Sequence, residues 1–94
     1  MDFTYNGKPI IPTKAVLDEL NKIDLDLYGV VKILETGFEV RKREKNVTER
    51  AITKKNKVTN VVIVDMDGYY KLIHVGEFTL TKKLRNKMED KNGL

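Results

Sequence analysis

The residues of this chain with the clearest chemical potential are one histidine and a band of basic side chains. His74 is the only histidine, and residues 41–58 carry eight lysines and arginines against two glutamates. Concentrated positive charge attracts phosphate groups, and an imidazole can accept and donate a proton near neutral pH. If the fold brings the two together, His74 could move protons in RNA cleavage while a cation stabilises the phosphorane and the departing oxygen.

The spacing of the basic band indicates that its charges gather in space. On a strand, Arg41 and Arg43 project from one face and Lys42 from the other. Glu49-Arg50 and Lys54-Lys55 fall on the next predicted strand and its hairpin, which return beside the first basic segment in an antiparallel pair. We therefore expect a nucleic-acid-binding surface that includes Arg41, Lys42, Lys54 and Lys55. The structural alternative is a solvated edge with cross-strand ion pairs, each worth well under about 1 kcal/mol.

The aromatic and imidazole side chains near the C-terminal end each have a structural alternative too. His74 lies between Ile73 and Val75 on a predicted interior strand, where alternation places it on the face of Leu72 and Tyr70. That position favours a satisfied imidazole in the core over a catalytic one. Tyr69 and Tyr70 could stack on a base, although tyrosines beside a hairpin are more often packing residues.

Several classes of chemistry are excluded or disfavoured by the composition. The chain has no cysteine, which excludes disulfides, thiol catalysis and cysteine-ligated zinc, and one histidine cannot build a site of several imidazoles. Asp65-Met66-Asp67-Gly68 is similar to the start of a calcium loop but lacks the later ligands, so we interpret it as a turn. No cofactor or metal is expected. The opening residues do not form a secretion signal and the longest strongly apolar run, Val61 to Val64, is far too short for a membrane span, so we expect a cytoplasmic protein.

The N-terminal half of the single domain expected over residues 1–94 is predicted to be helical after a short lead-in. Pro9 and Pro12 favour an extended lead-in or edge strand over residues 1–12. Apolar residues at helical spacing predict a helix over residues 14–23 with Thr13 as its N-cap. A second helix is predicted over residues 25–36, with Asp24 as its cap and Gly37 after its end.

The pattern then changes to strands. We predict strand residues at Phe38 to Val40, a turn at Lys45-Asn46 and a second strand around residues 51–53. A hairpin loop at residues 54–57 leads into a central strand predicted over residues 58–66. A turn at Asp67-Gly68 then connects it to a strand predicted over residues 69–75. Thr79 or Thr81 is the predicted cap of a last helix that runs through Met88, before a frayed tail over residues 89–94. The expected fold class is α+β: two N-terminal helices packed on a three- to four-stranded antiparallel sheet, with a C-terminal helix.

A set of short strings in this order resembles a small, mainly prokaryotic group of domains related to RelE/ParE-type toxins. The strings are Ile33-Leu34-Glu35-Thr36-Gly37, Arg43, Val47-Thr48-Glu49-Arg50, Val61-Val62-Ile63-Val64 and Ile73-His74-Val75-Gly76-Glu77-Phe78. The resemblance spans residues 13–88. It implies a helical hairpin on an antiparallel sheet, and a type II toxin that an antitoxin protein wraps and neutralises. In the RelE branch it implies cleavage of messenger RNA in the ribosome.

The resemblance carries over four catalytic candidates: Arg43, Glu49, Arg50 and His74. In one respect the chain departs from typical active toxins, because Gly76-Glu77-Phe78 stands where those toxins have a basic, aromatic catalytic end. We therefore carry two expectations. The first is an RNA-directed toxin with endoribonuclease activity, or a poison of DNA topology of the ParE kind. The second is a non-catalytic module that binds nucleic acid or an acidic protein.

Overall fold

The first strands of the fold form around an Asn-Gly turn. In the computed structural model, which describes residues 3–79, β1 (Thr4–Tyr5) and β2 (Lys8–Pro12) pair as an antiparallel hairpin. Asn6 and Gly7 have φ values of 53° and 80°, which this turn requires and which these two residue types tolerate well. The predicted lead-in is thus a hairpin that belongs to the sheet.

The two helices follow with their boundaries set by side-chain caps. In α1 (Lys14–Lys22) the hydroxyl of Thr13 accepts a hydrogen bond from the Val16 backbone N–H at 3.2 Å, so the predicted cap is confirmed. In α2 (Leu27–Thr36) the cap is Asp26, whose carboxylate accepts from the Gly29 N–H at 2.8 Å. The prediction of Asp24 as this cap is wrong, because Asp24 has a φ of 54° and lies in the connection between the helices.

Gly37 ends α2 at a point where the backbone passes close to the sheet. Its N–H donates to the Ile33 carbonyl at 2.8 Å. A Cβ at this position would stand 2.5 Å from the Ile33 oxygen and 2.6 Å from the Ala51 oxygen, so no larger residue fits without displacing backbone. The chain can therefore pass directly from the helix into β3 (Phe38–Glu39), which pairs with β4 (Val47–Lys54).

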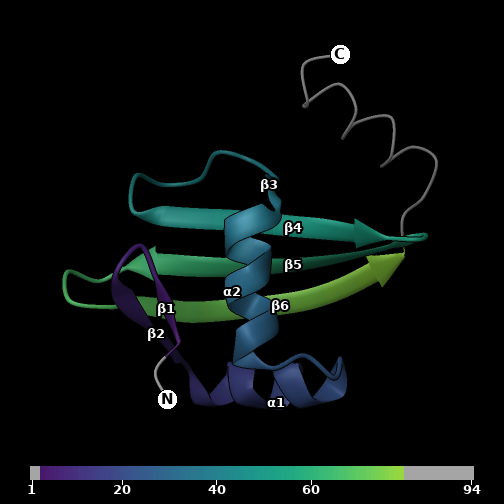
Figure 1. Ribbon diagram of the computed structural model, residues 1–94, viewed down its shortest axis with the longest axis horizontal. Helices are drawn as coiled ribbons and strands as arrows, with labels where there is room; N and C mark the ends of the chain where they lie inside the picture. The colour runs from purple at the N-terminus through teal and green to yellow at the C-terminus, as the bar shows by residue number, and fades with distance from the viewer. Residues whose placement is uncertain (1–2, 80–94) are drawn as a thin grey trace.

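The sheet has six strands in the order β1-β2-β6-β5-β4-β3 and curls around α2 (Figure 1). β4, β5 (Lys57–Asp65) and β6 (Tyr70–Thr79) form an antiparallel meander, which confirms the two predicted hairpins and the central place of the Val58 to Met66 segment. β2, however, pairs parallel to β6, so the sheet is mixed and larger than the predicted three- to four-stranded antiparallel one. The α+β class and the two N-terminal helices are confirmed.

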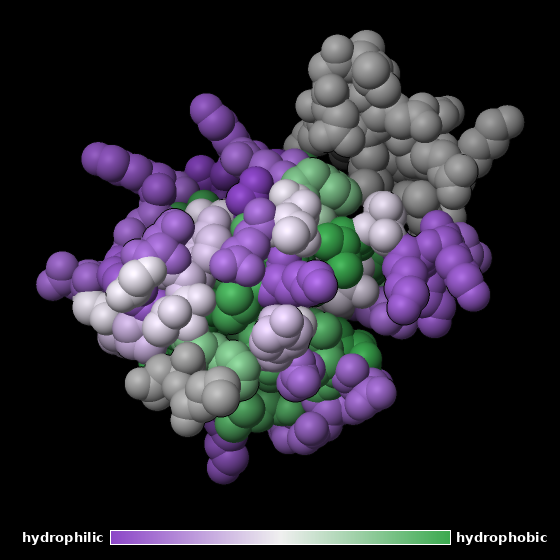
Figure 2. Space-filling model, in the orientation of Figure 1, coloured by the Kyte–Doolittle hydropathy of each residue, from purple (hydrophilic) through white to green (hydrophobic). Residues whose placement is uncertain are grey.

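The two faces of the sheet have different environments. Both helices lie on one face, where Val30, Ile33 and Leu34 of α2 pack in a core cluster with Val61, Ile63, Leu72 and Val75 of the sheet. Figure 2, viewed from this side, shows apolar side chains between charged ones that project around the rim. Alternation along β5 points Val58, Asn60 and Val62 to the other face, and these three are also buried.

The predicted C-terminal helix from Thr79 or Thr81 to Met88, and the tail over residues 89–94, lie outside the described residues, which end with Thr79 in β6. Within residues 3–79, neither helix has the length and apolar character needed to cross a membrane.

Candidate functional site

A β-bulge in β6 decides the direction of His74. Val62 pairs with His74 whereas Ile63 pairs with Leu72, so Ile73 is an extra residue with no partner of its own. Unbroken alternation would place His74 beside Leu72 in the core. The bulge leaves Leu72 in the core cluster and turns His74 to the opposite face, where it is exposed. The prediction of a buried core imidazole is therefore wrong.

We call the sheet surface opposite the helices the histidine face. Two rows of paired residues define it: Glu49, Val62 and His74 in one row, and Ala51, Asn60 and Gly76 in the next. Because paired residues in an antiparallel sheet project to the same side, all six lie on this face.

Glu49 is the centre of a polar cluster on the histidine face. It is only 2% exposed. One carboxylate oxygen, Oε1, lies 3.1 Å from Arg41 Nε and 3.2 Å from Arg43 Nη1, while Oε2 accepts a hydrogen bond from Asn60 Nδ2 at 2.9 Å. A single buried anion thus binds two guanidinium groups that come from the connection between β3 and β4.

The two arginines stay accessible although their counterion is buried. The side chains of Arg41 and Arg43 are 61% and 40% exposed, against 3% for Glu49. Each guanidinium has five N–H donors, and Glu49 engages only part of them. The remaining donors are held in place for an anion with two or more oxygens, which is the recognition that arginine performs best.

A hollow lies beside the arginine pair. Its volume is about 490 Å³. Its lining contains Arg41, Arg43, Glu44, Asn46, Val47, Val64 and Ile73. Three apolar side chains therefore stand next to two cations and one carboxylate, which suits a ligand that joins a phosphate to a flat or apolar group.

Asn60 and Gly76 are members of the site that the sequence-based predictions lack. The position of a Cβ on Gly76 would be 3.0 Å from both Asn60 Oδ1 and His74 Nε2, so the absent side chain leaves room for the imidazole beside the Asn60 amide. An available signal was Asn60 itself, since a polar residue inside an otherwise apolar central strand needs a polar partner. Asn60 connects the Glu49 cluster to the neighbourhood of His74.

The structure separates the other candidates from this cluster. Arg50 points to the helix-covered face, where its Nη1 donates to the Leu34 carbonyl at 3.1 Å near the end of α2. Lys54 and Lys55 stand at the β4–β5 turn and line a different pocket. Lys42 is exposed and lines a further cavity with Arg41 and Arg43. Of the eight predicted residues, Arg41, Arg43, Glu49 and His74 share one face and Lys42 borders it.

Comparison with protein-family models gives no match for this chain, and neither curated proteins nor solved structures match it. Residues 3–79 contain no group of three or more histidine, aspartate or glutamate side chains placed to hold a metal ion.

Proposed function

We propose that this domain binds RNA on its histidine face and cleaves it, as an RNA-directed toxin of the RelE/ParE type would. The observation that carries the proposal is the pair Arg41 and Arg43, fixed by one buried carboxylate on the face that also exposes His74. In this proposal the domain acts in the cytoplasm, its RNA is messenger RNA in the ribosome, and an antitoxin protein neutralises it.

The arginine pair would take the phosphate. Free N–H donors of the two guanidinium groups bind the two non-bridging oxygens of a phosphodiester, and the adjacent hollow with Val47, Val64 and Ile73 accepts a nucleobase against an apolar wall. Glu49 positions the two arginines and does not touch RNA, because both its oxygens are engaged and the side chain is buried.

His74 would move the proton. Its imidazole removes the proton of a ribose 2′-hydroxyl, the 2′-oxygen attacks phosphorus, and the bond from phosphorus to the 5′-oxygen breaks. The imidazolium then gives the proton to the departing 5′-oxygen, which leaves a 2′,3′-cyclic phosphate and a 5′-hydroxyl. The two guanidinium groups stabilise the additional negative charge on the pentacoordinate phosphorus.

The test is cleavage of labelled messenger RNA on ribosomes, and of the same RNA alone, with analysis of the product ends. We expect cyclic phosphate ends from the wild type and a loss of about 100-fold or more in cleavage rate with His74→Ala, at unchanged RNA affinity. Arg41→Ala with Arg43→Ala should weaken both affinity and rate. Lys32→Ala, on an exposed turn of α2, is the matched control. Full cleavage by His74→Ala would remove His74 from the mechanism.

One observation favours a second candidate, a binding module without catalysis. Glu49, the carboxylate nearest to the arginine pair, is sealed from the surface and cannot assist His74 as a second acid or base. This candidate predicts that RNA stays intact with and without ribosomes. It also predicts that the RNA affinity falls steeply between about 50 and 200 mM salt, as expected for a protein that contacts a few phosphates. Fluorescence anisotropy combined with gel analysis of the RNA separates the two candidates.

A further inference from the structure

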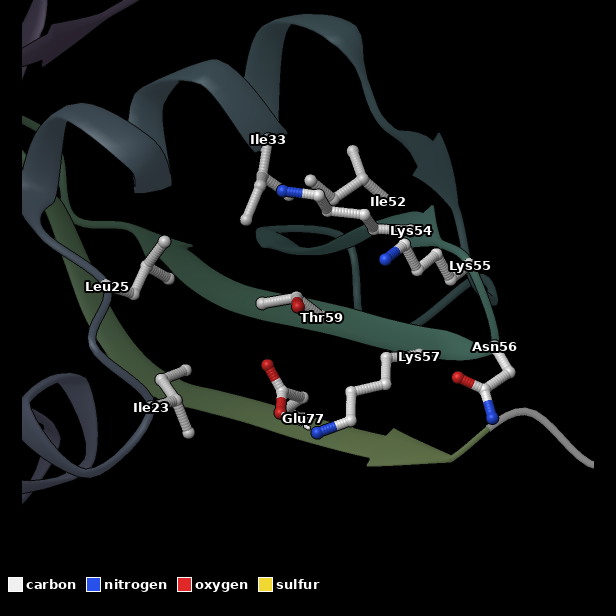
Figure 3. A pocket seen from close by; sticks show the side chains of 10 residues that line it. All are labelled: Ile23, Leu25, Ile33, Ile52, Lys54, Lys55, Asn56, Lys57, Thr59 and Glu77. Carbon is white, nitrogen blue, oxygen red and sulfur yellow. Dashed lines mark hydrogen bonds and ion pairs between the residues drawn. The ribbon is translucent and has the colours of Figure 1, made fainter.

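A second pocket lies on the other side of the sheet from the histidine face, between the α1–α2 connection and the β4–β5 turn (Figure 3). Its volume is about 370 Å³. That is near the lower end of the range of about 300–1,000 Å³ found for small-molecule sites. None of its lining residues belongs to the arginine cluster, so this pocket is a separate feature of the molecule.

The pocket is apolar at one end. Ile23 and Leu25 enter from the α1–α2 connection, Ile33 from α2 and Ile52 from β4. Ile33 is buried, but the other three are only partly buried even though they pack against the core cluster. Part of this apolar surface is therefore exposed to water, and its burial against the apolar part of a ligand would be favourable in free energy.

The opposite end carries the charge. Lys54 ends β4, Lys55 stands in the turn and Lys57 begins β5, so three lysines line this part of the pocket. Figure 3 shows the Lys54 and Lys55 side chains on the side of β4, and the Lys57 side chain reaching across to Glu77. Glu77 pairs with Lys57 at 3.3 Å and satisfies that charge. Lys54 and Lys55 take part in none of the ion pairs found within residues 3–79. Figure 3 shows the Thr59 hydroxyl between the two ends of the pocket, as a further polar group.

We infer that this pocket is a binding site for a small amphipathic carboxylate, with its acid group at Lys54 and Lys55 and its apolar body against Ile23, Leu25 and Ile52. The inference follows from the polarity of the pocket. A neutral apolar ligand leaves two ammonium groups without a counterion, and a short hydrophilic anion leaves the apolar end uncovered. Only a ligand with both parts, such as a medium-chain fatty acid, complements both ends.

The test is titration of the full chain with decanoate, followed by NMR on isoleucine and leucine methyl groups. We expect saturable shifts at Ile23, Leu25 and Ile52, and weaker binding of decanol and of butyrate. Lys54→Ala with Lys55→Ala should weaken decanoate binding about tenfold or more and leave decanol binding unchanged. Lys14→Ala with Lys32→Ala, two exposed lysines on the helices, is the matched control.

Two results would overturn the inference. The first is equal affinity of the wild type for decanoate and decanol, since the lysines would then contribute nothing. The second is methyl shifts confined to residues outside the pocket. Circular dichroism of each variant establishes that the fold is retained, and the conservative pair Lys54→Arg and Lys55→Arg should keep most of the decanoate affinity. RNA cleavage has no part in this test, so the outcome is independent of the proposed function.

Discussion

At the scale of single residues, Glu49 shows how a buried charge can serve a surface site. Its carboxylate is removed from water, which is costly, and three partners compensate the cost: two guanidinium groups and the Asn60 amide. Such a cluster is stable while its partners are all present, and it fixes flexible arginine side chains in one geometry. In the proposed RNA complex, Arg41 and Arg43 would therefore meet a phosphate with part of their conformational entropy already lost.

This arrangement predicts the effect of Glu49→Gln. The variant keeps the shape of the side chain but removes the charge, so both arginines lose their counterion and can turn into solvent. We expect a loss of about 1–3 kcal/mol in the free energy of unfolding, measured by urea denaturation, because charge-assisted hydrogen bonds are replaced by weaker ones. RNA affinity should fall as well.

The matched control is Glu35→Gln, an exposed glutamate on α2, which should change neither quantity. If Glu49→Gln raised the RNA affinity, Glu49 would act by repelling phosphate and not by positioning the arginines.

At the scale of elements, the N-terminal hairpin is attached to the sheet by a small polar and aromatic cluster. Lys8 of β2 pairs with Asp65 at the end of β5, and its ammonium group lies 4.4 Å from the ring centroid of Tyr70. Tyr5 packs against Tyr70 with ring centroids 5.6 Å apart. These contacts connect segments that are far apart in the sequence, and they stand beside the parallel pairing of β2 with β6.

The hairpin contact predicts a pH dependence at high pH. The hydrogen bond to Asp65 raises the pKa of Lys8 above its usual value of 10.5. A raised pKa in the folded state means that the charged form stabilises the fold. The stabilisation is complete below the usual lysine pKa and is lost as the pH rises through the raised value. Hairpin docking should therefore weaken only in strongly alkaline solution.

The measurement is the titration of the Lys8 side-chain carbon signal by NMR, in the wild type and in Asp65→Asn. The midpoint should move to lower pH in the variant, because the largest cause of the shift is removed. An identical midpoint in both proteins would show that the pair does not form in solution.

At the scale of the whole molecule, the two sides of the sheet carry different features. The helix-covered side contains the core cluster and the pocket lined by isoleucines and lysines, and the other side presents the arginine cluster and His74. β5 is buried on both sides, since Val61, Val62 and Ile63 in succession have almost no exposure. Stability and both proposed sites therefore depend on the same central strand.

Substitution in this strand should unfold the domain. Ile63→Asp would place an unpaired carboxylate in the core cluster, at a cost on the order of 4 kcal/mol or more, which is a large part of the total stability of a domain of this size. Thermal denaturation followed by circular dichroism is the measurement. Thr53→Asp, on the exposed end of β4, is the control and should melt close to the wild type. A cooperative, soluble Ile63→Asp protein would contradict the assigned core.

Local interactions explain which elements the sequence predicts correctly. The Thr13 cap, the end of α2 at Gly37 and the turn at Asp67-Gly68 depend on residues a few positions apart, so their residue types are sufficient to indicate them. The central strand is evident from its apolar residues alone. The Asp24 cap fails by two positions, because Asp26 offers the same carboxylate to the helix that actually begins at Leu27.

The amino-acid sequence shows which residue types are available for chemistry, whereas the pairing and packing of the strands select which of them meet. Arg43 and Arg50 are the same residue type, but strand parity places Arg50 under α2 while Arg43 binds Glu49. One extra residue in β6 turns His74 out of the core, and the pairing of β2 with β6 joins residues about sixty positions apart. Bulges and long-range pairings depend on the packing of whole strands and leave little mark on neighbouring residue types, so they emerge only when the chain is folded.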